Sequence, residues 1–267
     1  MSDHFHSLNC ISFGVPFQLT ADSESMLTSM LACAPGGTQV CPFSIPGARK
    51  FSLLTQEGTV NVAAGDKTPV EHAELKSALQ QLARDLMVHV ANYAPERVFM
   101  HAGVVGWRGR ALVFPGTSFA GKTTLVAELV RAGATYYSDE YAVLDEDGCV
   151  YPYPRDLQMR LAGGPEQTAV AVEHLGGSVG TGPVRVSLVV FTEYKASGDW
   201  QPEPVSPGNA VLEMLRHAIP VQRTPARVMA TLAKMMESAT AVRTERAEGR
   251  EAARSLLAAL TLERSSA

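Results

Sequence analysis

The feature that most constrains this chain is the stretch Gly116-Thr-Ser-Phe-Ala-Gly-Lys-Thr123, which satisfies the pattern G-x-x-x-x-G-K-S/T in full. It follows the strand-like segment "RGRALVFPG" and precedes the helical segment "KTTLVAELVRAG", which Gly133 would end. Glycines at these positions let successive backbone N–H groups face phosphates, and the helix N-terminus adds a favourable dipole. The sequence therefore predicts an α/β nucleotide-binding fold.

Each part of this loop has a predicted role at a nucleotide. We expect Lys122 to reach the β and γ phosphates and Thr123 to offer its hydroxyl to Mg²⁺. The residues expected to contact the nucleotide are Gly116, Thr117, Ser118, Phe119, Ala120, Gly121, Lys122, Thr123 and Thr124. No N-K-x-D segment that could recognise guanine occurs in the chain. The predicted ligand is therefore ATP with Mg²⁺.

Two acidic residues, Asp139 and Glu140, end the strand-like segment that directly follows the loop's helix. A strand paired beside the loop's strand would bring Asp139 near the γ phosphate, to accept a proton from an attacking hydroxyl or to bind Mg²⁺. The competing interpretation is a solvated strand end. Many P-loop ATPases carry their metal-organising acid farther downstream, and Glu193 occupies such a position here. The short spacing favours a kinase, with a P-loop ATPase and a catalytically silent ATP-binding regulatory or scaffold protein as alternatives.

The block "HAGVV...GRALVFPGTSFAGKTTLVAELVRAGATYYSDEYAVL", within about residues 98 to 160, resembles the catalytic domain of the HPr kinase/phosphorylase family and its shorter relatives. The shared pattern is a His-led strand, a P-loop, a helix ending in Arg-x-Gly and a strand ending in paired acids. The resemblance implies a phosphoenolpyruvate-carboxykinase-like P-loop kinase core with a mixed sheet, acting on a Ser-type hydroxyl. By position it implies Asp139 as the general base and His101 near the phosphates. We expect Thr123 with Glu140 to arrange Mg²⁺.

The chain departs from that family at several points. Glu140 replaces the usual second Asp, and Phe119 or Ala120 stands where a glycine is usual. A later signature of the true HPr kinases has no counterpart, and the N-terminal third differs from theirs. The acceptor is therefore left open between a peptide, a protein and a small hydroxylated metabolite. Arg155 and Arg160 follow the acid pair and are candidates for stabilising charge on the transferred phosphoryl group, although surface arginines are commoner.

Composition limits the partners of this 267-residue chain. Charged residues make up 19% and the net charge is −4, so no overall basic field draws it to nucleic acid or to anionic membranes. No leader segment and no run of about 18 apolar residues is visible, and the four cysteines form no C-x-x-C pair. We expect a soluble cytoplasmic protein. Homo-oligomers are left open, because kinases of the resembling family often form rings.

Two domains are predicted along the chain: a small α+β subdomain over residues 1–95 and the nucleotide-binding kinase domain over 96–267. Leucines at steps of three and four predict a long helix from 69 to 93. A hairpin is predicted around Glu57-Gly58, and a central strand over 183–194. Helices are expected at about 206–218, 225–239 and 244–262. The Gly-rich segment 161–183 is a candidate lid.

Overall fold

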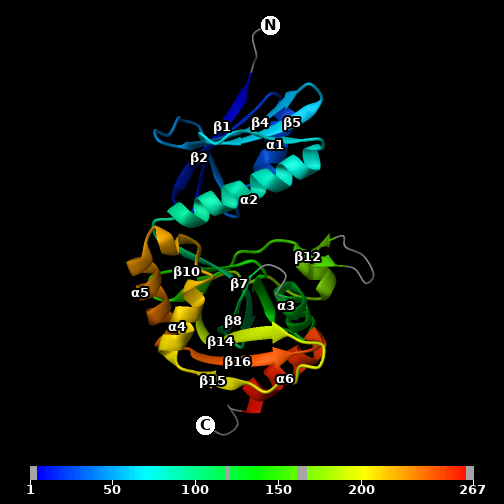
Figure 1. The fold of residues 1–267 in the computed structure, drawn as a ribbon, viewed down its shortest axis with the longest axis vertical. Helices are drawn as coiled ribbons and strands as arrows, with labels where there is room; N and C mark the ends of the chain where they lie inside the picture. The colour runs from blue at the N-terminus through cyan, green and yellow to red at the C-terminus, as the bar shows by residue number, and fades with distance from the viewer. Residues whose placement is uncertain (1–4, 118–120, 161–166, 263–267) are drawn as a thin grey trace. The chain divides into compact units, whose positions relative to one another are not determined.

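A computed structural model describes residues 5–117, 121–160 and 167–262 of the chain. The chain divides into two compact units, Met1–Arg97 and Val98–Ala267. Each unit combines helices with a sheet of mixed strand direction (Figure 1). The predicted α/β class is therefore confirmed.

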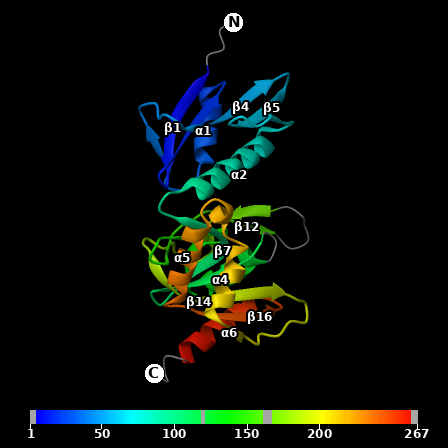
Figure 2. The same cartoon turned by 60° about the vertical axis from the view of Figure 1, so that its left-hand side comes forward.

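The first unit is one sheet covered by two helices. Its strand order is β3-β1-β2-β4-β5-β6, in which β2 and β4 are parallel and the other neighbours antiparallel. The strands are β1 (His6–Ser12), β2 (Val15–Ala21), β3 (Gln39–Cys41), β4 (Arg49–Gln56), β5 (Thr59–Ala64) and β6 (Val70–His72). The helices are α1 (Glu24–Ala32) and α2 (Leu75–Tyr93) (Figure 2). Alternate residues of β2 are buried, and Phe17 meets Phe51 of β4 edge to face.

The sequence predicted one part of this unit correctly and misplaced another. The hairpin at Glu57-Gly58 is confirmed, and both residues adopt positive φ, as a two-residue turn between twisted strands requires. The long helix begins at Leu75 instead of residue 69. Residues 70–72 form β6 because they satisfy the backbone groups along the free edge of β5.

The second unit has an eight-stranded sheet in the described part of the chain, with the main order β11-β10-β7-β8-β14-β16-β15 and β9 paired to β7. The sheet strands are β7 (Val98–Trp107), β8 (Arg110–Pro115), β9 (Thr135–Ser138), β10 (Tyr141–Leu144), β11 (Cys149–Tyr151), β14 (Val184–Tyr194), β15 (Glu203–Val205) and β16 (Thr240–Arg246). A separate hairpin pairs β12 (Leu157–Arg160) with β13 (Gln167–Val170). The helices are α3 (Lys122–Arg131), η1 (Val172–Leu175), α4 (Pro207–Leu215), η2 (Ile219–Gln222), α5 (Pro225–Met236) and α6 (Gly249–Leu262).

Apolar residues alternate along the central strands and supply two cores. Ala111 and Val113 of β8 face a core shared with α4 and α5, whereas Leu112 and Phe114 face a core shared with α3 and α6. Figure 1 shows these helix pairs on opposite sides of the sheet. β14 lies between β8 and β16 and is parallel to both, so the predicted central strand is confirmed.

The end of the chain corrects one prediction. The expected helix over 244–262 begins at Gly249, because residues 240–246 pair with β14 as β16 and bury Ala241, Thr244 and Arg246 between neighbouring elements. The segment predicted as a lid contains β13 and η1, while its residues 161–166 lie outside the described ranges. None of the helices in the described ranges is both long and apolar enough to cross a membrane.

Two turn glycines of the second unit give a stability prediction. Gly148 (φ 73°) lies against α5, and an added Cβ would stand 2.5 Å from the Met235 Cα. We expect Gly148→Ala to lower the free energy of unfolding by about 3 kcal/mol or more, since backbone cannot yield as a side chain does. Gly109 (φ 77°) is the matched control, because its Cβ would meet nothing within 4 Å. Gly109→Ala should cost only about 1–2 kcal/mol, and equal losses in urea unfolding would contradict the steric argument.

Candidate functional site

The loop that satisfies the phosphate-binding pattern connects the buried end of β8 to the start of α3. Gly121 precedes the helix with φ 74°, a conformation that glycine adopts at little cost. Among the residues that the structure describes, no side chain caps the first backbone N–H groups of α3. Ser118, Phe119 and Ala120 lie outside the described residues.

The Lys122 side chain folds back toward the start of the loop. Its Nζ donates to the carbonyl oxygens of Gly116 at 2.9 Å and Thr117 at 2.6 Å. Burial lowers the pKa of Lys122, while Asp139 and Glu140 act in the opposite direction. The lysine thus brings a cation to the loop, beside two carboxylates.

Asp139 follows β9 and lies within hydrogen-bonding distance of the first turn of α3. The Thr123 hydroxyl donates to Asp139 Oδ2 at 2.9 Å. The pairing that positions Asp139 differs from the expected one: β9 pairs with β7, not with the loop's own strand. Both edges of β8 are already occupied, by β7 through a tight hairpin and by β14. The chain nevertheless brings the acid to Thr123.

Tyr136 holds the other oxygen of the same carboxylate. Its hydroxyl lies 2.9 Å from Asp139 Oδ1 and 3.0 Å from the Arg155 carbonyl oxygen, so its single proton is shared between two acceptors. Burial raises the pKa of Asp139, and the hydrogen bonds from Thr123 and Tyr136 partly offset that rise. The group is a carboxylate of raised basicity in a defined orientation.

Glu140 is held by Arg155. The two side chains form an ion pair and are each about two-fifths exposed. Burial raises the pKa of Glu140, and the Arg155 guanidinium opposes that rise. The backbone oxygen of Glu140 also accepts from the N–H of Ala102, which anchors the acid pair to β7. Of the two candidate arginines, Arg155 therefore joins the acid pair, whereas the side chain of Arg160 lies outside the described part of the chain.

His101 lies on β7 opposite Tyr141 of β10, and the two ring centroids are 4.8 Å apart. Its backbone N–H donates to the His217 carbonyl at 2.9 Å, and its carbonyl accepts from Gly116. Burial, Lys122 and His217 together lower the pKa of His101. The neutral imidazole is therefore favoured at pH 7.

Two residues considered from the sequence, Glu193 and Thr124, do not join the cluster around Asp139 and Glu140. Glu193 is exposed near the end of β14, in register with Glu245 of β16. Thr124 is exposed on α3, beside the start of α6. Neither side chain forms a hydrogen bond with the acid pair in the described residues.

Three residues at this site escaped the sequence reasoning. The sequence indicates only that Tyr136 belongs to a strand and that His217 belongs to a helix. Arg246 is 2% exposed, ends β16 and donates from Nη2 to the Gly121 carbonyl at 2.9 Å. The alternation "TAVRTER" was the available signal for a strand that ends beside the loop.

The site carries oxygen atoms that could contribute to holding a magnesium nucleotide. No group of three or more His, Cys, Asp or Glu side chains in the described residues could hold a metal by itself. Mg²⁺ commonly takes one or two protein oxygens and completes its shell with phosphates and water. Thr123, Asp139 and Glu140 carry oxygens of that kind beside the N-terminal end of α3. No protein-family model and no curated protein matches this chain.

Proposed function

We propose that the second unit is a P-loop kinase core and that the protein transfers the γ-phosphoryl group of ATP to a hydroxyl acceptor. The observation that carries this proposal is the hydrogen bond between Thr123 and Asp139, which joins the phosphate-binding pattern to a carboxylate of raised basicity. The similarity of the sequence block to HPr-kinase-like enzymes supports the same class. The acceptor stays open between a Ser-type hydroxyl of a peptide, of a protein and of a small metabolite.

Bound Mg²⁺ and ATP would supply the electrophilic phosphoryl group. Asp139 would orient the acceptor hydroxyl and take its proton as the new P–O bond forms, while the bond from the γ phosphorus to the β–γ bridging oxygen breaks and ADP leaves. Lys122 and the loop amides would hold the phosphates and offset negative charge that develops there. His101, neutral at pH 7, would donate or accept a hydrogen bond at the same edge.

The Thr123–Asp139 contact also favours a second assignment of roles. A carboxylate that accepts from the loop threonine is well placed to organise Mg²⁺, and Glu140 would then be the base. The Arg155 ion pair would hold Glu140 ready for that task. Both assignments describe a kinase. They differ in which of the two acids binds Mg²⁺ and which acts only as the base in phosphoryl transfer.

Incubation of the full chain with γ-labelled ATP, Mg²⁺ and a panel of Ser-containing peptides, carrier proteins and hydroxylated metabolites tests the proposal. The expected result is Asp139-dependent label on one acceptor class. ATP binding without transfer to any acceptor would instead support the silent scaffold. Acceptor-independent phosphate release that requires Glu193 would support an ATPase.

The pH dependence of transfer gives a prediction about Tyr136. Burial raises the pKa of Asp139, so the active base is lost as pH falls through a value above the ordinary aspartate pKa of 3.8. The Tyr136 hydrogen bond lowers that pKa, so Tyr136→Phe should move the acid limb of the rate profile to higher pH. Tyr137→Phe is the matched control, because the Tyr137 hydroxyl donates to Gly182 instead. An acid limb unchanged by Tyr136→Phe would count against Asp139 as the base.

A further inference from the structure

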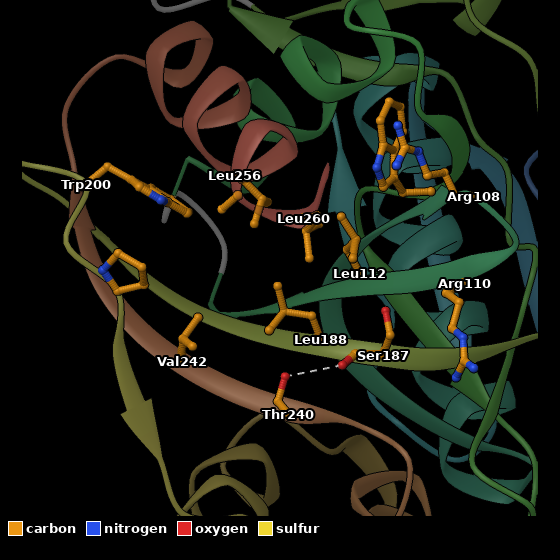
Figure 3. Close-up of a pocket in the computed structure, with 13 residues that line it drawn as sticks. Arg108, Arg110, Leu112, Ser187, Leu188, Trp200, Thr240, Val242, Leu256 and Leu260 are labelled. Atoms are coloured by element: carbon orange, nitrogen blue, oxygen red, sulfur yellow. Dashed lines mark hydrogen bonds between the residues drawn. The ribbon is translucent and has the colours of Figure 1, made fainter. Parts of the chain in front are cut away.

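The second unit contains a cavity of about 300 Å³ at the end of the sheet away from the phosphate-binding loop. It opens beside the first residues of β8, whose last residue leads into the loop. Its apolar walls come from β8, β14, β16 and α6 (Figure 3). They include Leu112, Leu188 and Val242 from the sheet and Leu256 and Leu260 from α6.

One end of the cavity carries two arginines from the hairpin between β7 and β8. Arg108 and Arg110 are exposed, and neither forms an ion pair with any residue that the structure describes. The Arg108 guanidinium carbon lies 5.5 Å from the centroid of the Trp107 ring. Arg108 also adopts φ 51°, a backbone conformation that is unfavourable for a residue with a side chain. A two-residue turn favours Asn or Gly at this position, so the arginine stands there against backbone preference.

Trp107 adds a polar group to the same end. It lines the cavity, and its indole Nε1 is buried with no hydrogen-bond acceptor among the described residues. A buried donor without an acceptor lowers the stability of the folded state. A ligand oxygen that reached this N–H would remove that cost.

We propose that this cavity binds an amphipathic carboxylate with an apolar body, at a site separate from the nucleotide loop. Leucine and valine walls would take the apolar body, and the arginines with the Trp107 N–H would take the carboxylate oxygens. Guanidinium groups match the planar geometry of carboxylates, and the volume lies at the small end of ordinary ligand sites. A chain or ring system of about ten carbons fits these dimensions.

The two tryptophans of the chain, Trp107 and Trp200, both line this cavity, so intrinsic fluorescence reports on it directly. The full-length protein is titrated with decanoate below its micelle concentration, and with decan-1-ol as the uncharged match. We expect a saturable fluorescence change with decanoate and about fivefold weaker binding of the alcohol, which is the upper end of the range for exposed ion pairs. No saturable change, or equal binding of both compounds, would overturn the proposal.

Variants separate the two recognition elements. The double variant Arg108→Gln/Arg110→Gln should weaken decanoate binding about fivefold while leaving decanol binding unchanged. Trp107→Phe keeps an aromatic ring but removes the N–H, and should weaken decanoate binding with Trp200 as the remaining reporter. Arg254→Gln is the matched control, since Arg254 is an exposed arginine of α6 outside the cavity lining.

Analytical sedimentation of the same proteins tests whether a second copy of the chain covers the cavity. A dimer of the parent protein that dissociates in the double arginine variant would mean that a second copy covers the cavity. That result would overturn the carboxylate proposal. Sedimentation unaffected by the arginine replacements, together with the charge-dependent fluorescence change, would support it.

Discussion

Replacing Asp139 by Asn should lower the rate of phosphoryl transfer about 10²–10⁴-fold, the range for loss of a general base. Asparagine keeps nearly the same shape and retains an oxygen for the Thr123 or Tyr136 hydroxyl, but it cannot take a proton at neutral pH. The measurement is the single-turnover rate with γ-labelled ATP and the identified acceptor. Transfer by Asp139→Asn at the parent rate would show that the base is another group.

The matched comparison for this variant is Glu140→Gln. If Asp139 is the base, Asp139→Asn should slow transfer about 10²–10⁴-fold while ATP binding persists. Glu140→Gln should instead raise the Mg²⁺ concentration that half-maximal ATP binding requires. The reverse pattern would assign the base to Glu140. Comparing transfer with Mg²⁺-dependent ATP binding for both variants therefore distinguishes the two role assignments.

Unfolding of Asp139→Asn separates lost chemistry from lost structure. Burial raises the pKa of Asp139, so the folded protein keeps this proton to higher pH than the unfolded chain does. The contribution of this group to the free energy of unfolding therefore falls as pH rises through that interval. Above it, Asn avoids the cost of a buried charge. The variant should unfold at an equal or higher urea concentration than the parent at pH 8, and a markedly lower one would contradict this.

Replacing Lys122 by Met should lower kcat/KM for ATP about 10²–10³-fold, as loss of a charged group that stabilises the transferring phosphoryl would. Methionine fills similar space without the charge. In the described structure Lys122 contacts only loop carbonyls through its Nζ, so the fold should persist. The measurement is the steady-state rate over a range of ATP concentrations, with binding of a fluorescent ATP analogue in parallel.

Lys234→Met is the control for that variant. Lys234 is exposed on α5 and pairs with Glu237 at 2.8 Å, a surface ion pair of small energetic value. It should leave both binding and rate unchanged. If Lys122→Met bound the nucleotide with the same affinity as the parent, the proposed contact between Lys122 and the phosphates would be wrong.

Secondary structure was predicted best where local sequence signals were strong. It was predicted worst where pairing with another strand determined the conformation. The strand before the loop, the helix after it and the Glu57-Gly58 hairpin carry their own turn and periodicity signals. Residues 70–72 and 244–246 lay next to helical patterns and were assigned to them. Both became strands because a neighbouring strand offered unpaired backbone groups, which no local window reveals.

At the candidate site, the sequence alone determined the composition of the loop and the presence of acids shortly after its helix. These follow from residue type and spacing, since phosphate-binding loops need glycines, a lysine and a hydroxyl in fixed order. Tertiary structure alone decided that β9 pairs with β7 and that Asp139, which follows β9, still contacts Thr123. It also decided that Tyr136 and Arg155 contact the two acids. The contact between Arg246 and Gly121 likewise depends on the tertiary structure. Those contacts join segments far apart along the chain, and sheet order, which depends on packing of both faces, brings them together.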